Sequence, residues 1–222
     1  GPLFRVGLIR LGEEDHVLFI TMHHIVSDAG SMDILIREVS AFYRALTGPH
    51  PDRPPALPHL AVQYADYAAW ERARLSDAVL EKQLGYWQQR LGGELPVLRL
   101  PTKPRPPRAT YRGRNRRLTI PARIAEDMIR QSRETDVTPF MFLLAVFEML
   151  LYRWSGQEDL IVGTPITNRD RVEVVPLVGF FVNTLALRTD LSSDDPYRLR
   201  FETLLERVRE TTLEAYDHRD LP

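Results

Sequence analysis

The stretch LFITMHHIVSDAGSMDIL, Leu18–Leu35, places two adjacent histidines at the end of an apolar run. Asp28 follows the second histidine by four residues, and a turn of small residues then leads into an apolar pattern with helical spacing. The apolar run predicts a strand, and a strand of this kind usually carries apolar side chains into a core. The ionisable residues at its end therefore indicate a polar site.

The two histidines are not expected to enter the same site. In a regular strand successive side chains point to opposite faces, so only one of the two is expected to face the site, and we expect His23 to be a buried structural residue. Opposed faces and a single nearby carboxylate disfavour a metal site, and we predict none. The sequence has no cysteine and no G-x-S-x-G turn, which disfavours a hydrolase triad. This leaves an imidazole that acts without a protein nucleophile.

Strands and helices are predicted on both sides of this stretch. The second strand is apolar on both faces, so we expect it to be central in its sheet. Ser31 is expected to cap the helix that follows, and Thr138 to cap a helix that is apolar, and therefore buried, on every side. The patterns predict strands at 3–11, 16–26, 159–166 and 179–191, and helical segments from Ser31 to Gly48, at 62–91, 121–136, 137–156 and 201–208. Strands mixed with helices in two parts indicate the α/β class.

A proline-rich basic segment, LPTKPRPPRATYRGRNRRLTI, lies in the middle of the chain. It contains seven basic residues, no acid and a single aromatic residue, Tyr111. A role in binding phosphate or nucleic acid is the alternative, but four prolines and the lack of stacking aromatics favour a solvated linker. We place this linker at 96–117, between a first part at 1–95 and a second part at 118–222.

Composition bounds the class of protein. With 222 residues, 44% of them hydrophobic, the chain can form one large domain or two small lobes. A net charge of -1 provides no general attraction to nucleic acid or to an anionic membrane. The sequence shows no signal-peptide pattern and no apolar run near the roughly 18 residues that a membrane span needs. We therefore expect a cytoplasmic protein that binds neither nucleic acid nor membrane.

Four short motifs occur in the order that one enzyme family shows. HHIVSDAG resembles the HHxxxDG motif of the condensation domains of nonribosomal peptide synthetases, which are relatives of chloramphenicol acetyltransferase. YADYAAW, VGFFVNTLALR and HRDLP then resemble three later motifs of that family, at Tyr64–Trp70, Val178–Arg188 and His218–Pro222. Each motif alone is weak evidence, whereas four in order over nearly the whole chain are specific.

The resemblance implies a two-lobed chloramphenicol acetyltransferase-like fold, with mixed sheets, flanking helices and a tunnel between the lobes. Motifs that open the family domain are absent, and so is the sequence that completes its second lobe. We therefore expect a fragment that is incomplete at both ends. Residues 1–95 would end the N-lobe and carry the HHxxxD motif, and residues 118–222 would begin the C-lobe.

The resemblance also implies an amide-forming acyltransferase of peptide antibiotic biosynthesis. The amine of an aminoacyl thioester would attack an acyl or peptidyl thioester. Donor and acceptor carrier (thiolation) domains would bring both groups on phosphopantetheine arms, next to an adenylation domain, and the domain itself would bind no cofactor. The alternatives are a related epimerisation domain, an O-acyltransferase, and an inactive carrier-docking module.

The resemblance to the condensation domain family implies that His24 is the catalytic residue. An imidazole with the ordinary pKa of about 6.5 is mostly neutral at pH 7, so it can accept the proton of the attacking amine or hold that amine in place. Base catalysis typically contributes roughly 10² to 10⁴-fold, and positioning two tethered reactants can contribute several kcal/mol more. We therefore expect positioning to dominate.

The remaining motif residues are expected to support this histidine. Asp28 would form a structural ion pair with Arg169, or failing that with Arg171. Ala29 stands where the motif has glycine, and would cost about 1 kcal/mol if that position needs a positive φ. Gly30 stands where tryptophan is common.

Further supporting residues belong to the later motifs. Ser31 and Asn183 are expected to line the tunnel or bind substrate, with capping of a strand end as the alternative for Asn183. His218 and the aromatic residues of YADYAAW are expected to be structural.

Overall fold

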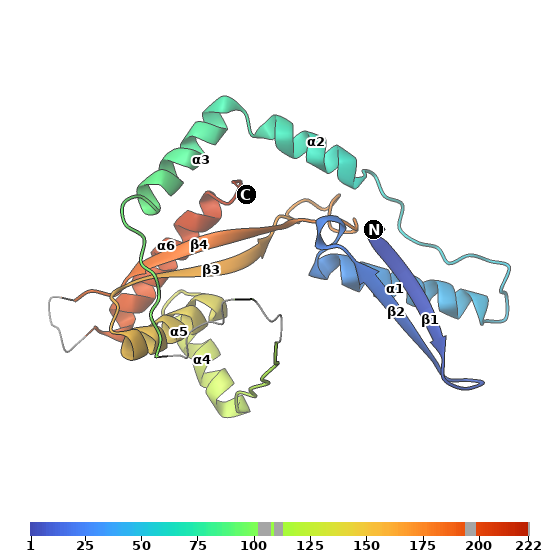
Figure 1. Cartoon of the computed structure of the whole chain (residues 1–222), viewed down its shortest axis with the longest axis horizontal. Coiled ribbons are helices and arrows are strands. Elements are labelled where there is room, and N and C mark those ends of the chain that lie inside the picture. The colour runs from blue at the N-terminus through green and yellow to red at the C-terminus, as the bar shows by residue number, and fades with distance from the viewer. Residues whose placement is uncertain (102–107, 109–112, 194–198, 222) are drawn as a thin grey trace. The chain divides into compact units, whose positions relative to one another are not determined.

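The computed structural model describes residues 1–101, 108, 113–193 and 199–221 as helices joined to short sheets (Figure 1). The chain divides into two compact units: unit 1 comprises 1–81 and 165–184, and unit 2 comprises 82–164 and 185–221. The helices and strands are β1 (Phe4–Arg10), β2 (His16–Met22), the 3-10 turn η1 (His24–Val26), α1 (Ala29–Leu46), α2 (Tyr64–Arg74), α3 (Asp77–Arg90), α4 (Ala122–Glu134), α5 (Pro139–Ser155), β3 (Asp159–Thr167), β4 (Val182–Asp190) and α6 (Phe201–Asp217).

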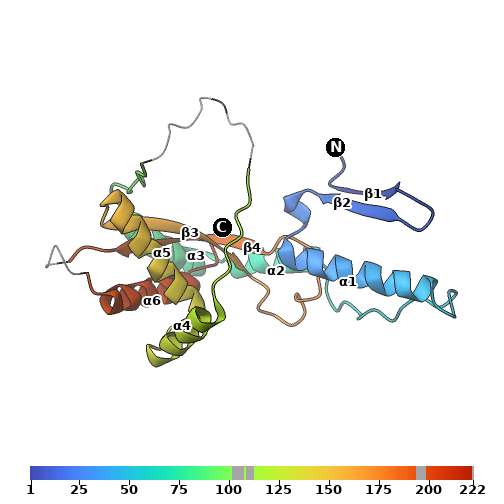
Figure 2. The same ribbon diagram turned by 90° about the horizontal axis from the view of Figure 1, so that it is seen from below.

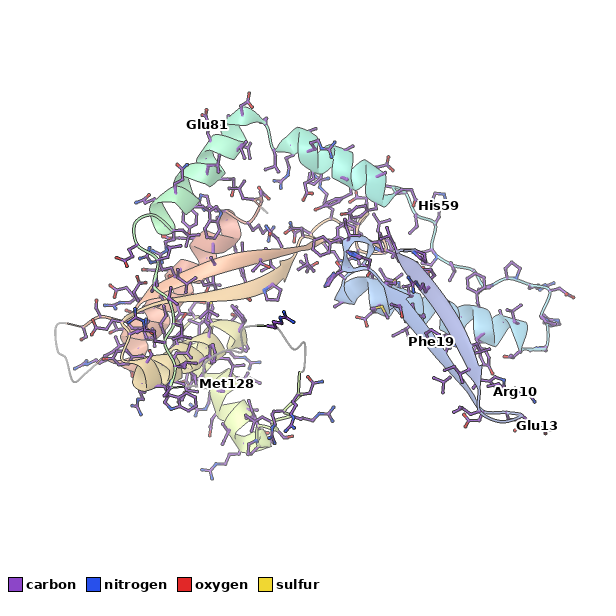
Figure 3. The ribbon with its side chains drawn as sticks, in the orientation of Figure 1. Arg10, Glu13, Phe19, His59, Glu81 and Met128 are labelled. Atoms are coloured by element: carbon purple, nitrogen blue, oxygen red, sulfur yellow. The ribbon has the colours of Figure 1, made fainter. Side chains whose placement is uncertain are left out.

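Unit 1 begins with an antiparallel hairpin. β1 pairs with β2 from Phe4 opposite Met22 to Arg10 opposite His16. Figure 2 shows the hairpin alongside α1, and Figure 3 shows Phe19 on β2. Within the described part of the chain this sheet has two strands, so the prediction that β2 is central in its sheet is wrong for this structure. Several apolar side chains of β2 are exposed, among them Val17, Leu18 and Phe19.

The polar stretch after β2 departs from the predicted strand. β2 ends at Met22, and the 3-10 turn η1 follows at once, so the prediction that the strand continues to Val26 is wrong. α1 begins at Ala29, and its N-cap is Asp28, whose side chain accepts a hydrogen bond from the Ser31 backbone N–H. The prediction of Ser31 as the cap is therefore also wrong, because the Asp28 carboxylate reaches the free N–H of the first turn.

The long helical pattern predicted at 62–91 is interrupted in the structure. α2 ends at Arg74 and α3 begins at Asp77, so Leu75 and Ser76 separate two helices. α2 packs into the small apolar core of unit 1, which contains Tyr67, Val174, Leu177 and Phe181 with Leu60, Val62 and Tyr64 around them. This core contacts the polar stretch through Phe181, whose backbone N–H donates to Asp28 Oδ2.

Unit 2 contains α4, α5, α6 and most of the β3–β4 sheet. Thr138 caps α5 with Pro139 in the first turn, which confirms the predicted start of that helix. α5 packs against α6 and α4 (Figure 1). Only one side of α5 is buried, since Phe147 and Trp154 on its other side are exposed, so the prediction of burial on every side is wrong for this structure.

The predicted linker at 96–117 falls partly outside the described residues, at 102–107 and 109–112. The lobe boundaries at 95 and 118 remain predictions. Among the described helices, none is alone long and apolar enough to cross a membrane. α4 and α5 pass that test only as a pair, and this pair is bent by 106° at its break.

Candidate functional site

The His24 ring is held in one tautomer by the turn that carries it. Its Nδ1 lies 2.7 Å from the backbone oxygen of Ser27. A carbonyl oxygen can only accept, so Nδ1 carries the proton in this hydrogen bond, and the neutral ring keeps its lone pair on Nε2. Because His24 is exposed in this structure, Nε2 belongs to a ring that an incoming group can reach. The turn therefore presents a proton acceptor.

His23 has the opposite hydrogen-bond pattern. Its Nδ1 accepts a hydrogen bond from the Ile25 backbone N–H at 3.1 Å, which caps the 3-10 turn. Its own backbone N–H donates to the Leu3 oxygen at 2.7 Å and ties the turn to the start of the hairpin. These contacts support a structural role for His23, although the residue is exposed rather than buried as expected. The difference in hydrogen bonding, rather than opposed strand faces, distinguishes the two rings.

Asp28 fixes the C-terminal end of the turn. Its Oδ1 accepts from Ser31 N, Ser31 Oγ and Arg169 Nη2, each at 2.8 Å, and its Oδ2 accepts from Phe181 N at 3.1 Å. Burial by itself would raise the pKa of Asp28, but hydrogen bonds from Arg169, Ser31 and Phe181 together lower it below the ordinary 3.8. Asp28 is therefore an ionised structural anchor, and it is only 4% exposed.

Arg169 connects that anchor to a loop of unit 1. Its Nη1 donates to three backbone carbonyls, those of Val174, Val175 and Leu177, at 3.0, 3.3 and 2.7 Å. Its guanidinium carbon lies 4.0 Å from the centroid of the Phe181 ring. The structure thus brings Asp28 and Arg169 together, whereas the second candidate arginine, Arg171, lies over the Trp70 ring at 4.4 Å.

The two small residues of the motif have different surroundings. Ala29 is the first residue of α1, its side chain is exposed, and it does not have a positive φ, so the expected backbone strain is absent there. A Cβ added to Gly30 would lie 3.0 Å from Arg169 Nε, closer than an ordinary contact. The glycine at position 30 therefore leaves room for the arginine of the ion pair.

Ser31 is completely buried beside the same ion pair. Its Oγ accepts from Gly179 N and Arg169 Nη2, each at 3.0 Å, and donates its proton to Asp28 Oδ1 or the Gly179 oxygen, each at 2.8 Å. These surroundings favour a structural role over the substrate-binding role expected from the sequence.

Asn183 lies at the start of β4. Its Oδ1 accepts from the Thr184 backbone N–H at 2.7 Å, and the residue is half-buried. This hydrogen bond supports the strand-end alternative for Asn183.

The segment Gly179–Phe181 closes one side of the site. The Tyr64 hydroxyl donates to the Phe180 oxygen at 2.8 Å, so the first tyrosine of YADYAAW positions this segment as well as packing the helix. A Cβ on Gly179 would overlap the Tyr64 ring, which explains why glycine stands there. The Phe180 ring contacts the His24 ring edge to face, with centroids 5.3 Å apart and planes at 87°.

Sequence reasoning missed two contributors to this site. Phe180 and the Ser27 carbonyl were not predicted, although both contact His24. The pair of adjacent phenylalanines in GFFVN was the available signal, because extended backbone points one of them away from the core. No sequence pattern identifies the carbonyl, because every residue has one.

A cavity in unit 2 does not belong to this site. A cavity of about 760 Å³ lies within unit 2, lined by Tyr86, Gln89, Arg90, Asp159, Arg188, Asp190, Arg207, Glu210, Thr211 and Glu214. Two of its arginines hold the local structure, since Arg188 pairs with Asp159 and Arg90 donates to the Arg188 oxygen. In the part of the chain that the structure describes, no three metal-ligating side chains come together.

Comparison with known proteins adds to this geometry. The sequence profile described as Condensation domain matches residues 1–222. A linear gramicidin synthase polypeptide of Brevibacillus parabrevis is 48% identical over 223 residues, which cover 100% of this chain but 3% of that protein. Malpibaldin synthetase of Mortierella alpina is 44% identical over 226 residues, which cover 100% of this chain and 4% of that protein. The chain thus spans a small part of these curated relatives.

Solved structures align over nearly the whole chain. The X-domain in complex with OxyB from teicoplanin biosynthesis has a TM-score of 0.84 and 31% identity, covering 99% of this chain and 48% of that one. The first condensation domain of the calcium-dependent antibiotic synthetase, in complex with a substrate analogue, has a TM-score of 0.70 and 25% identity, with 99% and 48% coverage.

Proposed function

Because this chain belongs to the condensation domain family, we propose that it forms part of an enzyme that joins two thioester-bound building blocks through a peptide bond. Its fold is the mixed α/β, chloramphenicol acetyltransferase-like fold of that family, as expected from the motifs. The chain spans about half the length of the solved relatives.

In the proposed reaction, the amine nitrogen of the acceptor attacks the carbonyl carbon of the donor thioester. The new C–N bond forms, the C–S bond breaks, and the proton lost by the amine passes to Nε2 of His24 and then to the departing thiolate. The Ser27 carbonyl oxygen accepts a hydrogen bond from Nδ1–H throughout the reaction. This hydrogen bond strengthens while the ring carries a positive charge. His24 thus accepts and returns one proton in each cycle.

The observation that carries this proposal is the tautomer of His24. The Ser27 carbonyl occupies Nδ1, so the exposed ring offers Nε2 as its acceptor. Asp28 does not compete for this role, since its oxygens are already engaged by Ser31, Arg169 and Phe181. The ion pair instead holds the C-terminal end of the turn, and Ser31 and Gly30 pack against it.

The test replaces His24 in the full-length protein that contains this chain. With a donor and an acceptor carrier loaded, His24→Ala should lower the rate of amide formation by roughly 10² to 10⁴-fold, measured by mass spectrometry of the product. His59→Ala is the matched control, since His59 is also an exposed histidine of unit 1 (Figure 3), and its rate should not change. An unchanged rate for His24→Ala would contradict the proposed role.

The proposed partners follow from the same reaction. Two carrier domains would supply the building blocks on phosphopantetheine arms, and an adenylation domain would lie nearby in the same polypeptide. The lobe assignment, 1–95 and 118–222 around a linker at 96–117, and a cytoplasmic location belong to this proposal. The named synthases and synthetases among its relatives support it.

A docking module without chemistry is the second candidate. The X-domain has a higher TM-score to this chain than the calcium-dependent antibiotic condensation domain has, and it was solved as a complex with OxyB. A docking module would bind loaded carriers or another protein without forming an amide. The assay above separates the two candidates, because binding without product would favour docking.

A further inference from the structure

Phe180 is an exposed aromatic residue beside the proposed catalytic histidine. Its ring lies 5.3 Å from the His24 ring, centroid to centroid, with the two planes at 87°. The residue is 37% exposed, whereas its neighbour Phe181 is 2% exposed in the core of unit 1. The two side chains therefore point in different directions, and part of the apolar surface of Phe180 is exposed next to His24.

Hydrogen bonds to other parts of unit 1 fix the backbone around Phe180. Gly179 N donates to Ser31 Oγ at 3.0 Å, Tyr64 Oη donates to the Phe180 oxygen at 2.8 Å, and Phe181 N donates to Asp28 Oδ2 at 3.1 Å. Asp28 and Ser31, two of these partners, also form the start of α1, which directly follows the turn that contains His24. Phe180 and His24 are therefore positioned by the same polar cluster.

An apolar ring in edge-to-face contact with the His24 ring restricts what can approach that histidine. We propose that Phe180 is a specificity-determining residue, whose ring selects by size the apolar side chain of the aminoacyl or acyl group that reacts at His24. This inference rests on the proposed function. Phe180 needs no part in proton transfer, because a phenyl ring has no proton to exchange.

Size selection by an apolar wall predicts a change in preference rather than a uniform loss. One methylene in an apolar pocket is worth roughly 10 to 200-fold in kcat/KM. Phe180→Ala removes most of the ring and should raise the ratio of kcat/KM for large against small building blocks by roughly 10-fold or more. Phe180→Trp enlarges the ring and should shift the ratio in the opposite direction.

The experiment uses the full-length protein and two panels of loaded carriers. In one panel the acceptor carries alanine, valine, leucine or phenylalanine while the donor is constant, and in the other panel the donor varies. The panel in which the ratio changes identifies the group that Phe180 contacts. Phe42→Ala is the matched control, because Phe42 is an exposed phenylalanine of α1, and it should change neither ratio. Unchanged ratios for both Phe180 variants would overturn the inference.

A second measurement tests the contact without the reaction. Phe180→Leu keeps an apolar side chain and removes the ring, so the NMR signals of the His24 ring protons should lose their ring-current shift. If the unaltered protein forms no amide, the proposed function fails and size selection fails with it, even where the NMR shift shows the contact. If amide forms but neither the NMR signals nor the ratios change, size selection alone fails.

Discussion

Asp28 in unit 1 and Glu148 in unit 2 are both buried carboxyl groups, at 4% and 0% exposure, yet their surroundings differ. Asp28 accepts from a guanidinium, two backbone N–H groups and a hydroxyl. Glu148 accepts one hydrogen bond, from Thr189 Oγ1 at 3.1 Å, and its Oε2 has no partner in the described part of the structure. Burial is common to both, so the number and charge of the donors decide which one ionises.

The pKa values follow this difference. Hydrogen bonds from Arg169, Ser31 and Phe181 outweigh the effect of burial and lower the pKa of Asp28. Burial raises the pKa of Glu148 from 4.5 to about 7, and the single hydrogen bond from Thr189 opposes it only in part. Asp28 is thus a charged connection at the site, whereas Glu148 is an uncharged acid of the core below that pH.

The largest expected effect comes from removing the charge of Asp28. Asp28→Asn leaves Arg169 buried without its counter-ion, which typically costs roughly 3 to 5 kcal/mol of unfolding free energy. Because the pKa of Asp28 is lowered in the folded state, its stabilisation is present above pH 3.8 and is lost as the pH falls through the folded value. Urea unfolding of the full-length protein measures both effects, and a loss below about 1 kcal/mol would contradict the argument.

The second effect is a pH dependence of opposite sign, at Glu148. The folded pKa of about 7 exceeds the unfolded value of 4.5, so between these values only the unfolded chain releases the proton. Stability therefore falls as the pH rises from 4.5 to about 7, by roughly 3 kcal/mol, and Glu148→Gln should remove this dependence. Denaturation of both proteins at several pH values tests this, and parallel pH profiles would show that Glu148 is not the cause.

The smallest effect is expected at an exposed ion pair. Asp127 and Arg130 lie on α4, with side chains 53% and 57% exposed and their charged atoms 2.9 Å apart. Asp127→Asn should produce no measurable change in the unfolding midpoint, because solvent screens exposed pairs. This variant is the matched control for Asp28→Asn, and equal losses in both would mean that burial does not explain the effect at Asp28.

Local signals predicted much of the fold. The Thr138 cap with Pro139 located the start of α5, and the polar turn between apolar runs located the β1–β2 hairpin. The errors occurred at the start of one helix and at a break between two others, where the spacing of apolar residues does not fix the boundary. Asp28 displaced Ser31 as the cap of α1, and two residues at Leu75 and Ser76 interrupted a pattern that reads as one helix.

The candidate site shows the same division. The histidine pair, the aspartate and the two candidate arginines were identifiable from motif and charge alone, because residue types are written in the chain. Two features required the tertiary structure: which nitrogen of His24 is free, and which phenylalanine stands beside it. The first depends on the turn that replaces the end of the strand. The second depends on a segment about 150 residues away, fixed by hydrogen bonds to Ser31 and Asp28. The position of Phe180 beside His24 is set by these long-range contacts, so no local pattern contains it.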